Sequence, residues 1–302
     1  MLTRRFLIQS ARIVCIGAAS TLTPIALAPL ASAATLPVAC SETALRDAIN
    51  TANSTPNSSD TLNLAGGCTY RLTAELPAIT SPIVINGNGD TITRVAGTFR
   101  ILTVDGGALT VRAATLSNGD ATGSAVANGA GGAIVVTNNG SLNLNATVIQ
   151  NNHANFGGGI SVFSGSRAQI NASTFTGNSA TQNGGGIVSD GTVAVNASQI
   201  SGNTAGGAGG GIASIGTLTI NASRIQNNTA QTGGGLANGV PAVAGGTSTV
   251  TASNISNNSA NVGNPGGVYN NGGTVTLRAS RVAANTPSNC LNSPSPVPGC
   301  AG

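Results

Sequence analysis

Apolar and polar residues alternate in short, recurring runs along the middle of the chain. In one of these runs, Leu218, Ile220 and Ala222 alternate with threonine and asparagine, and this period of two is typical of a strand with one buried face. The alternation breaks after Ala222, and Ile225 begins a second inward-facing run. A third run follows the glycines at 209–211. The pattern therefore predicts three short strands, joined by bends, in each repeat.

Two sequence elements return at nearly constant spacing. Three glycines followed by an apolar residue occur at 157–160, 184–187, 209–212 and 233–236. An Asn-Ala-Ser or Asn-Ala-Thr element, with fainter later copies, places alanines at 146, 172, 197, 222, 252 and 279, with spacings of 26, 25, 25, 30 and 27 residues. A fixed period in this range is typical of a solenoid.

The length of the repeat selects the kind of solenoid. A period near 25 residues accommodates three short strands but not three helices. The 43 glycines of the chain suit bends with positive φ. They argue against an array of ankyrin-like helical repeats, which needs helix-forming residues. We therefore predict an all-β parallel β-helix, in which equivalent strands pair about 4.8 Å apart and the stacking of coils completes the core.

An apolar-x-x-Asn tetrad follows each Asn-Ala element. The tetrads end at Asn152, Asn178, Asn203, Asn228 and Asn258, with a fainter copy that ends at Asn285. Because stacking places equivalent residues in one column, these asparagines are predicted to form a ladder whose side-chain amides bond from coil to coil.

The motifs resemble those of a known family. Gly-Gly-Ala-Ile at 131–134 and Phe175-Thr-Gly-Asn178 resemble polymorphic outer membrane protein repeats, over about residues 100–286. That family pairs a G-G-A-(I/L/V) element with F-x-x-N in each coil of a right-handed parallel β-helix. The resemblance therefore implies a pectin-lyase-like solenoid, secretion and often surface display or adhesion, and it implies no catalytic residue. Isoleucine mostly replaces the phenylalanine of the family pattern.

The first 33 residues have the features of a secretory signal. Arginines at 4, 5 and 12 precede a proline-interrupted apolar run and the A-x-A sequence at 31–33. Cleavage is predicted between Ala33 and Ala34. Because the chain shows no second long apolar run, we expect no transmembrane span after removal of the signal.

The remaining chain is divided by its patterns into three parts. We expect an N-terminal cap over 34–60, the β-helix over 61–286 and a proline-rich, disulfide-closed tail over 287–302. The cap contains apolar residues at helical spacing between residues 41 and 53. This segment also resembles the N-terminal CSLREP signature of secreted β-helix proteins, with three residues inserted. Within it, Arg46 and Asp47 are expected to form an exposed ion pair.

Four cysteines remain after the signal is removed, and they allow three pairings. Sequence distance favours a bond between Cys40 and Cys68 and another between Cys290 and Cys300. An exported, oxidising location favours disulfides over free thiols. A zinc site is disfavoured, because the spacing does not fit and the chain has a single histidine.

Charge is sparse and nearly balanced. Charged residues form 7% of the chain, and without the three leader arginines nine arginines face eight acids, a net charge of +1. This balance predicts no nucleic-acid or anionic-membrane partner. Residues 86–90 suggest an isolated calcium turn, but calcium-binding β-rolls repeat such a motif about every nine residues. We therefore predict no metal or cofactor site.

Catalysis is the main alternative function, because parallel β-helices include polysaccharide lyases and glycoside hydrolases. A glycosidase needs two carboxylates that face one groove. Only Asp105, Asp120 and Asp190 fall in the regular coils, and no two of them are expected at one coil position. His153 occupies a bend position that Ser179 takes in the next coil, and we interpret it as a solvated bend residue rather than a base.

Two insertions interrupt the repeat, at 118–130 and 239–246. Loops of solenoids often carry function, but these two contain only one charged residue, Asp120. They are expected to leave the tube at different corners, without a need to converge on one cleft, and to be loops rather than a site.

Threonines supply a second alternative. The pairs Thr217/Thr219, Thr247/Thr249 and Thr274/Thr276 are expected at equivalent outward positions of three coils, and such ladders resemble ice-binding faces, although threonine is common in strands.

Our prediction is a secreted, extracellular or cell-surface protein with a structural or adhesion-type role and no catalytic residue. Its expected partners are extracellular polysaccharides or proteins.

Overall fold

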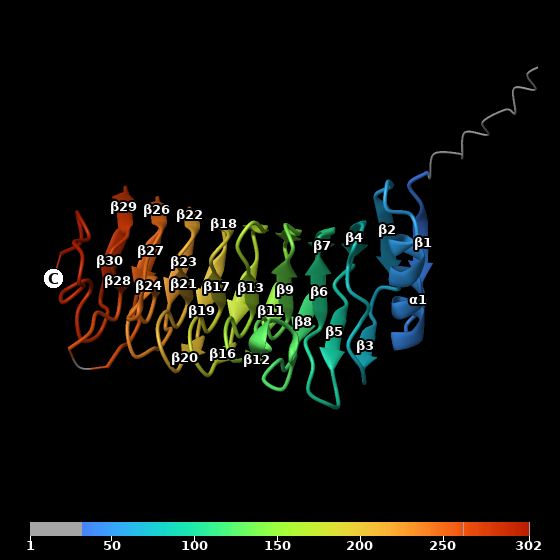
Figure 1. Cartoon of the computed structure of the whole chain (residues 1–302), viewed down its shortest axis with the longest axis horizontal. Helices are drawn as coiled ribbons and strands as arrows, with labels where there is room; N and C mark the ends of the chain where they lie inside the picture. Colours follow the sequence, from blue (N-terminus) through green and yellow to red (C-terminus); the bar gives the residue numbers. More distant parts are fainter. Residues whose placement is uncertain (1–31, 262, 302) are drawn as a thin grey trace, which may run out of the picture. The chain divides into compact units, whose positions relative to one another are not determined.

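Three long parallel sheets and one short sheet wind around a common bore (Figure 1). The computed structural model describes residues 32–261 and 263–301. The predicted signal lies outside this part of the chain, apart from its last two residues. The predicted parallel β-helix is confirmed.

The strands fall into columns by their place in the coil. The first sheet contains β1 (Thr35–Val38), β2 (Asp60–Leu64), β4 (Pro82–Asn86), β7 (Ala108–Arg112), β10 (Ser141–Asn145), β14 (Arg167–Asn171), β18 (Thr192–Asn196), β22 (Thr217–Asn221), β26 (Thr247–Thr251) and β29 (Thr274–Arg278). The second contains β3 (Thr69–Leu72), β5 (Thr91–Arg94), β8 (Thr115–Ser117), β11 (Val148–Gln150), β15 (Thr174–Thr176), β19 (Gln199–Ser201), β23 (Arg224–Gln226), β27 (Asn254–Ser256) and β30 (Arg281–Ala283).

The third sheet contains β6 (Leu102–Asp105), β9 (Ile134–Thr137), β13 (Ile160–Val162), β17 (Ile187–Ser189), β21 (Ile212–Ser214), β24 (Leu236–Val240), β25 (Val243–Ala244) and β28 (Val268–Asn270). A short sheet contains β12 (His153–Ala154), β16 (Ser179–Ala180) and β20 (Thr204–Ala205). Among these named strands, only the β24–β25 hairpin pairs antiparallel.

The bore is filled by stacked aliphatic side chains. Ile160 pairs in register with Ile187, and Ile187 pairs with Ile212; all three are fully buried. Such columns bury the inner faces that a single coil could not cover.

The bend between the first and second sheets differs from the prediction. Ala222 is exposed and has a φ of 48°, so it is not a third inward residue; the buried position belongs to Ser223. The equivalent alanines at 113, 146, 172, 197, 252 and 279 have φ values of 47–50°. This left-handed conformation costs a non-glycine residue about 1–2 kcal/mol.

A serine column offsets that strain. The hydroxyls of Ser173, Ser198, Ser223, Ser253 and Ser280 each accept the backbone N–H of the equivalent residue one coil earlier, at 3.0–3.1 Å. An unpaired buried N–H group costs about 1–3 kcal/mol. The serine hydroxyls avoid this cost, because they pair each buried N–H group at the bend.

The predicted asparagine ladder is confirmed. Asn152, Asn178, Asn203, Asn228 and Asn258 are at most 1% exposed. Each donates its side-chain amide to the Oδ1 atom of the asparagine one coil later, at 2.9–3.0 Å. The same Oδ1 atom accepts a backbone N–H of the earlier coil. Asn285 continues the column.

A second asparagine ladder lies on the outside of the first sheet, and it is built from the asparagines of the Asn-Ala elements rather than from those of the tetrads. Asn171, Asn196 and Asn221 each donate to the Oδ1 atom of the asparagine one coil earlier, at 3.0 Å. The inner amides thus donate toward the C-terminal end of the solenoid, and the outer amides donate toward the N-terminal end.

A helix caps the first coil. Helix α1 (Glu42–Asn53) begins after Ser41, whose side chain accepts the N–H of Ala44, and its buried apolar face packs on β1, β2, β3 and β4. The predicted Cys40–Cys68 disulfide joins this cap to the coil that follows. The expected ion pair is wrong in its partner: Arg46 pairs with Glu42, one turn earlier, at 2.9 Å, because residues four apart lie on one helix face.

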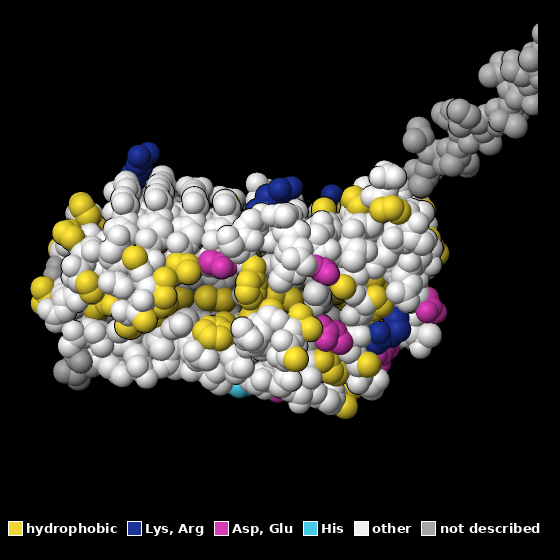
Figure 2. All heavy atoms as spheres, viewed as in Figure 1, with side chains coloured by type: hydrophobic (Ala, Val, Ile, Leu, Met, Phe, Trp, Pro, Cys, Tyr) yellow, Lys and Arg dark blue, Asp and Glu magenta, His cyan; other side chains and the backbone are white. Residues whose placement is uncertain are grey.

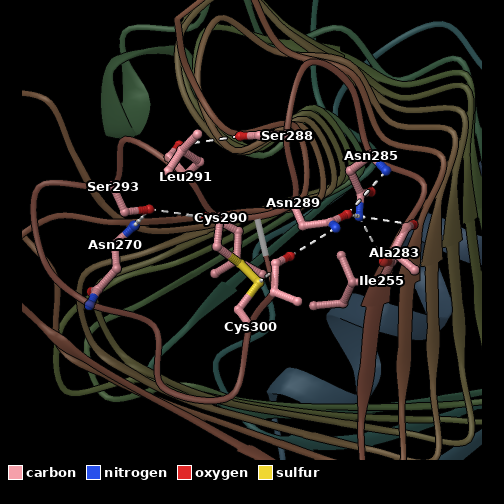
Figure 3. The surroundings of a disulfide bond; sticks show 12 residues. Ile255, Asn270, Ala283, Asn285, Ser288, Asn289, Cys290, Leu291, Ser293 and Cys300 are labelled. Carbon is pink, nitrogen blue, oxygen red and sulfur yellow. Dashed lines mark hydrogen bonds between the residues drawn. A yellow bond between two sulfur atoms is a disulfide. The ribbon is translucent and has the colours of Figure 1, made fainter.

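The C-terminal tail covers the last coil (Figure 3). Asn289 accepts the side-chain amide of Asn285 at 3.0 Å and so ends the inner ladder. The predicted disulfide joins Cys290 to Cys300, and the hydroxyl of Ser293 accepts the N–H of Asn270. The tail therefore supplies the acceptors that another coil would otherwise provide.

One inward column changes from apolar to polar. Val136 and Val162 occupy it in β9 and β13, and Ser189 and Ser214 occupy it in β17 and β21. Both serine hydroxyls are buried without a hydrogen-bond partner among the described residues.

We expect Ser189→Ala to raise the free energy of unfolding by about 1 kcal/mol, because it removes a buried hydroxyl that makes no bond. The matched control is Ser198→Ala, which deprives the N–H of Ser173 of its acceptor and should lower stability by about 1–3 kcal/mol. Urea unfolding of both variants measures this contrast. A loss of stability in Ser189→Ala as large as in Ser198→Ala would contradict it.

Candidate functional site: an apolar groove on the third sheet

The outer face of the third sheet is apolar although it lies outside the bore. Val188, Ala213, Ala237 and Tyr269 stack in register along it, and Ala213, Ala237 and Tyr269 belong to a second hydrophobic cluster, separate from the core. The space-filling view shows apolar side chains gathered in a hollowed band along one side of the solenoid (Figure 2).

A groove of about 300 Å³ opens over this face. Its floor includes Val188 and Ala213, and Phe163 and Ile215 stand beside them. Phe163 follows β13 directly and Ile215 follows β21, so the parallel register of the coils brings both onto one wall. An apolar lining of this kind favours an apolar ligand surface over a charged one.

Both insertions contribute to this groove. Ala127, Asn128 and Ala130 of the first insertion line it together with Val240 and Val243 of the second. The expectation that the insertions need not share a cleft is therefore wrong. The first insertion folds back through a tight turn, η1 (Val126–Gly129), in which Ala127 and Asn128 have φ values of 54° and 52°. The second insertion folds back as the β24–β25 hairpin. The sequence pattern did not indicate that both insertions fold toward the third sheet.

Arg100 holds the first insertion in place. Its guanidinium donates to the carbonyl of Val126 at 2.8 Å and to the hydroxyl of Ser124 at 3.0 Å, and it lies 3.5 Å from Glu75. Burial lowers the pKa of Arg100, although the nearby Glu75 carboxylate opposes this shift. This role could not be predicted from the sequence, because Arg100 has no equivalent in the other coils that would mark its position as special.

The acidic residues of the coils do not form a catalytic pair. Asp105 pairs with Thr137. Val136 pairs with Val162, and Val162 pairs with Ser189, so the residues that directly follow these three, Thr137, Phe163 and Asp190, continue the same column. The two aspartates thus share one column, contrary to expectation, but they are three coils apart. That spacing is about 14 Å, beyond the roughly 5–10 Å that separates the two carboxyl groups of glycoside hydrolases.

Asp190 lies at the edge of the groove. Burial raises the pKa of its carboxyl, and hydrogen bonds from the backbone of Asp190 and Ser164 offset this only in part. The groove therefore loses its nearest negative charge at a higher pH than an exposed aspartate would.

His153 lies in a polar column with Asp120 and Ser179. Its Nδ1 atom is 2.6 Å from the hydroxyl of Ser179, while the Asp120 carboxylate accepts the N–H and hydroxyl of Thr122. The N–H groups of Ser179 and Thr181 are bonded to carbonyls of the preceding coil, so neither is available to stabilise an oxyanion. The column resembles a serine triad in composition only.

Asp90, the last residue of the suggested calcium turn, is occupied by the neighbouring coil. Its carboxylate accepts the N–H of Cys68 at 2.7 Å and the N–H of Gly66 at 3.0 Å. Within residues 32–261 and 263–301, no three histidine, cysteine or acidic side chains are grouped so that they could hold a metal ion.

The threonine columns exist as expected. Thr217, Thr247 and Thr274 are in register, as are Thr219, Thr249 and Thr276. In earlier coils the same positions hold Ser141 and Asn143, then Arg167 and Gln169, then Thr192 and Ala194. The threonine face is therefore three coils long.

In the part of the chain that the structure describes, no helix combines the length and apolar character needed to cross a membrane. No protein-family profile matches the chain, and no curated protein matches it.

Proposed function

We propose that this chain is a secreted, non-catalytic β-helix protein with a structural or adhesion-type role, and that the groove on the third sheet is its contact surface. The groove carries the proposal, because two separate insertions and four successive coils combine to build one apolar surface outside the core. The exposed lining of the groove is mainly apolar, so an apolar side chain of an extracellular protein fits it better than a sugar, whose many hydroxyl groups each need a hydrogen-bonding partner.

Several features support secretion and surface exposure. The A-x-A sequence before Ala34 fits a signal peptidase site, and the two disulfides fit an oxidising compartment. The resemblance to polymorphic outer membrane protein repeats points in the same direction, and under this proposal the chain shares the exported, adhesive role of that family.

A binding experiment tests the role of the groove. We expect the mature protein to be retained on octyl-agarose and Ile215→Asp to elute early, because the substitution places a charge on the groove wall. Thr219→Asp, on the outer face of the first sheet, is the matched control and should elute with the unaltered protein. Equal retention of all three proteins would show that the groove is not the contact surface.

The same binding should depend on pH through Asp190. Since its pKa is raised, acidification neutralises this carboxyl early, and retention on octyl-agarose should increase as the pH falls through that pKa. The retention of Asp190→Asn at neutral pH should equal the retention of the unaltered protein at acidic pH. The retention of this variant should also change less with pH. An identical pH profile for both proteins would contradict this role.

Catalysis is tested with a panel of polysaccharides on a glycan array and in a reducing-sugar release assay. We expect no release of reducing sugar. Cleavage that is abolished by an alanine substitution at Asp105, Asp120 or Asp190 would overturn the non-catalytic proposal.

The registered threonine columns support ice binding as a second candidate function, and thermal hysteresis measured by nanolitre osmometry would decide it.

A further inference from the structure

A buried carboxylate lies beside the predicted signal cleavage site. Asp60, the first residue of β2, is 1% exposed. Its oxygens accept the hydroxyls of Thr55 and Ser58. Among the described residues, no arginine lies within ion-pair distance of it. A buried carboxylate without a cationic partner is costly unless hydrogen bonds or a counter-charge stabilise it.

The remaining partner of Asp60 is the backbone nitrogen of Ala34. This N–H donates to Asp60 Oδ1 at 2.7 Å, and the Ala34 carbonyl accepts the N–H of Thr61 at 2.8 Å. Strand β1 begins at the next residue and pairs with β2. Two hydrogen bonds therefore fix Ala34 at the edge of the first sheet, although Ala34 is exposed, as are Ser32 and Ala33.

We propose that Asp60 is a receptor for the α-ammonium group created when the bond between Ala33 and Ala34 is hydrolysed. This inference rests on the proposed secretion of the chain. A signal endopeptidase adds water across the peptide bond; Ala33 leaves with a carboxylate on the signal, and the nitrogen of Ala34 gains protons and becomes an ammonium group. The donor that is a neutral amide before cleavage becomes a cation after it, at the same atom.

The electrostatics of the site favour this pairing. Burial disfavours the charged form of Asp60, but the bonds from Thr55, Ala34 and Ser58 outweigh it and lower the pKa of the carboxyl. The carboxylate is thus ionised before the ammonium group arrives. The bond from the Ala34 N–H is already charge-assisted, because its acceptor is ionised. After cleavage the donor is charged as well, which adds a direct ion pair to this bond, so maturation should tighten the attachment of β1 to β2.

The pairing also selects one cleavage position. A chain that began at Ala33 or at Thr35 would place its amino group one residue away, about 3.3–3.6 Å along the extended chain. Only a chain that begins at Ala34 presents its ammonium group to Asp60 in the observed position.

The composition of the chain allows a direct measurement. The sequence contains no lysine, so the α-amino group is the single primary amine of the secreted protein. Intact mass and N-terminal sequencing first establish which residue begins the chain. The rate of acetylation by an N-hydroxysuccinimide ester at pH 7.5 then reports how much of this amine is unprotonated and accessible.

We expect acetylation of the protein that begins at Ala34 to be about tenfold slower than acetylation of Asp60→Asn, because an ion pair favours the unreactive ammonium form. Asp47→Asn, an exposed helix position, is the matched control and should react as slowly as the unaltered protein. A protein that carries one extra residue before Ala34 keeps Asp60 and should react as fast as Asp60→Asn. In urea all four proteins should react alike.

The outcomes separate the two proposals. A secreted chain that begins at a residue other than Ala34 would contradict the predicted maturation. A chain that begins at Ala34 but reacts at the same rate as Asp60→Asn and as the extended protein would overturn the receptor role of Asp60. If Asp60→Asn does not fold, the extended protein alone decides the question.

Discussion

Asn203→Ala is expected to lower the free energy of unfolding by about 3–5 kcal/mol. Asn203 is 0% exposed. Its Oδ1 atom accepts the backbone N–H and the side-chain amide of Asn178, and its own amide donates to the carbonyl of Phe175 and to Asn228. The truncation leaves several of these buried groups without a partner, and water cannot reach them from outside the bore.

The outer ladder supplies the control for this prediction. Asn196 also bonds to asparagines of the preceding and following coils, at 3.0 Å, but it is only partly buried. Water can replace its bonds, so Asn196→Ala should cost about 0.5–1.5 kcal/mol. Both variants are compared by urea unfolding at equilibrium. Equal losses would show that burial does not determine the strength of the ladder.

Gly210→Ala should destabilise the solenoid by about 3 kcal/mol or more, because overpacking between rigid backbones has no cheap relief. A Cβ atom at this position would lie against the carbonyl oxygens of Thr229 and Gly234, which belong to the next coil, closer than van der Waals contact allows. Relief requires the two coils to move apart, and that movement would lengthen the hydrogen bonds between them.

Gly202→Ala separates steric from conformational effects. Gly202 has a φ of +66°, but the nearest atom to an added Cβ is the hydroxyl oxygen of Thr176, at 3.9 Å. Alanine there should cost about 1–2 kcal/mol from backbone strain alone. Thermal unfolding of the two variants measures the difference. A smaller loss of stability for Gly210→Ala than for Gly202→Ala would show that neighbouring coils can accommodate a methyl group at residue 210, which would contradict the prediction.

The repeat made most of the fold predictable. The columns of isoleucine in the third sheet and the ladder through Asn203 follow from one period, because parallel stacking converts sequence spacing directly into contact. The disulfides followed from sequence distance, since each pair closes a short loop at one end of the tube.

The features that were missed depend on backbone angles or on segments outside the period. Ala222 has the alternation of an inward residue, but its positive φ turns it outward; alanine does not signal this conformation as glycine or asparagine would. The groove was not predicted, because the repeat period does not indicate the direction in which an insertion folds. Arg100 and the hairpin residues Val240 and Val243 acquire their roles only from that direction.

The opposite orientations of the two asparagine columns have an electrostatic consequence. The side-chain dipoles of the inner column point one way along the axis, and those of the outer column point the other way. In the coils that carry both columns, from Asn171 to Asn221, the two sets of dipoles oppose each other and cancel in part, as strand dipoles do within a sheet. Each added coil with both columns would therefore add less potential difference between the two ends than a coil with the inner column alone.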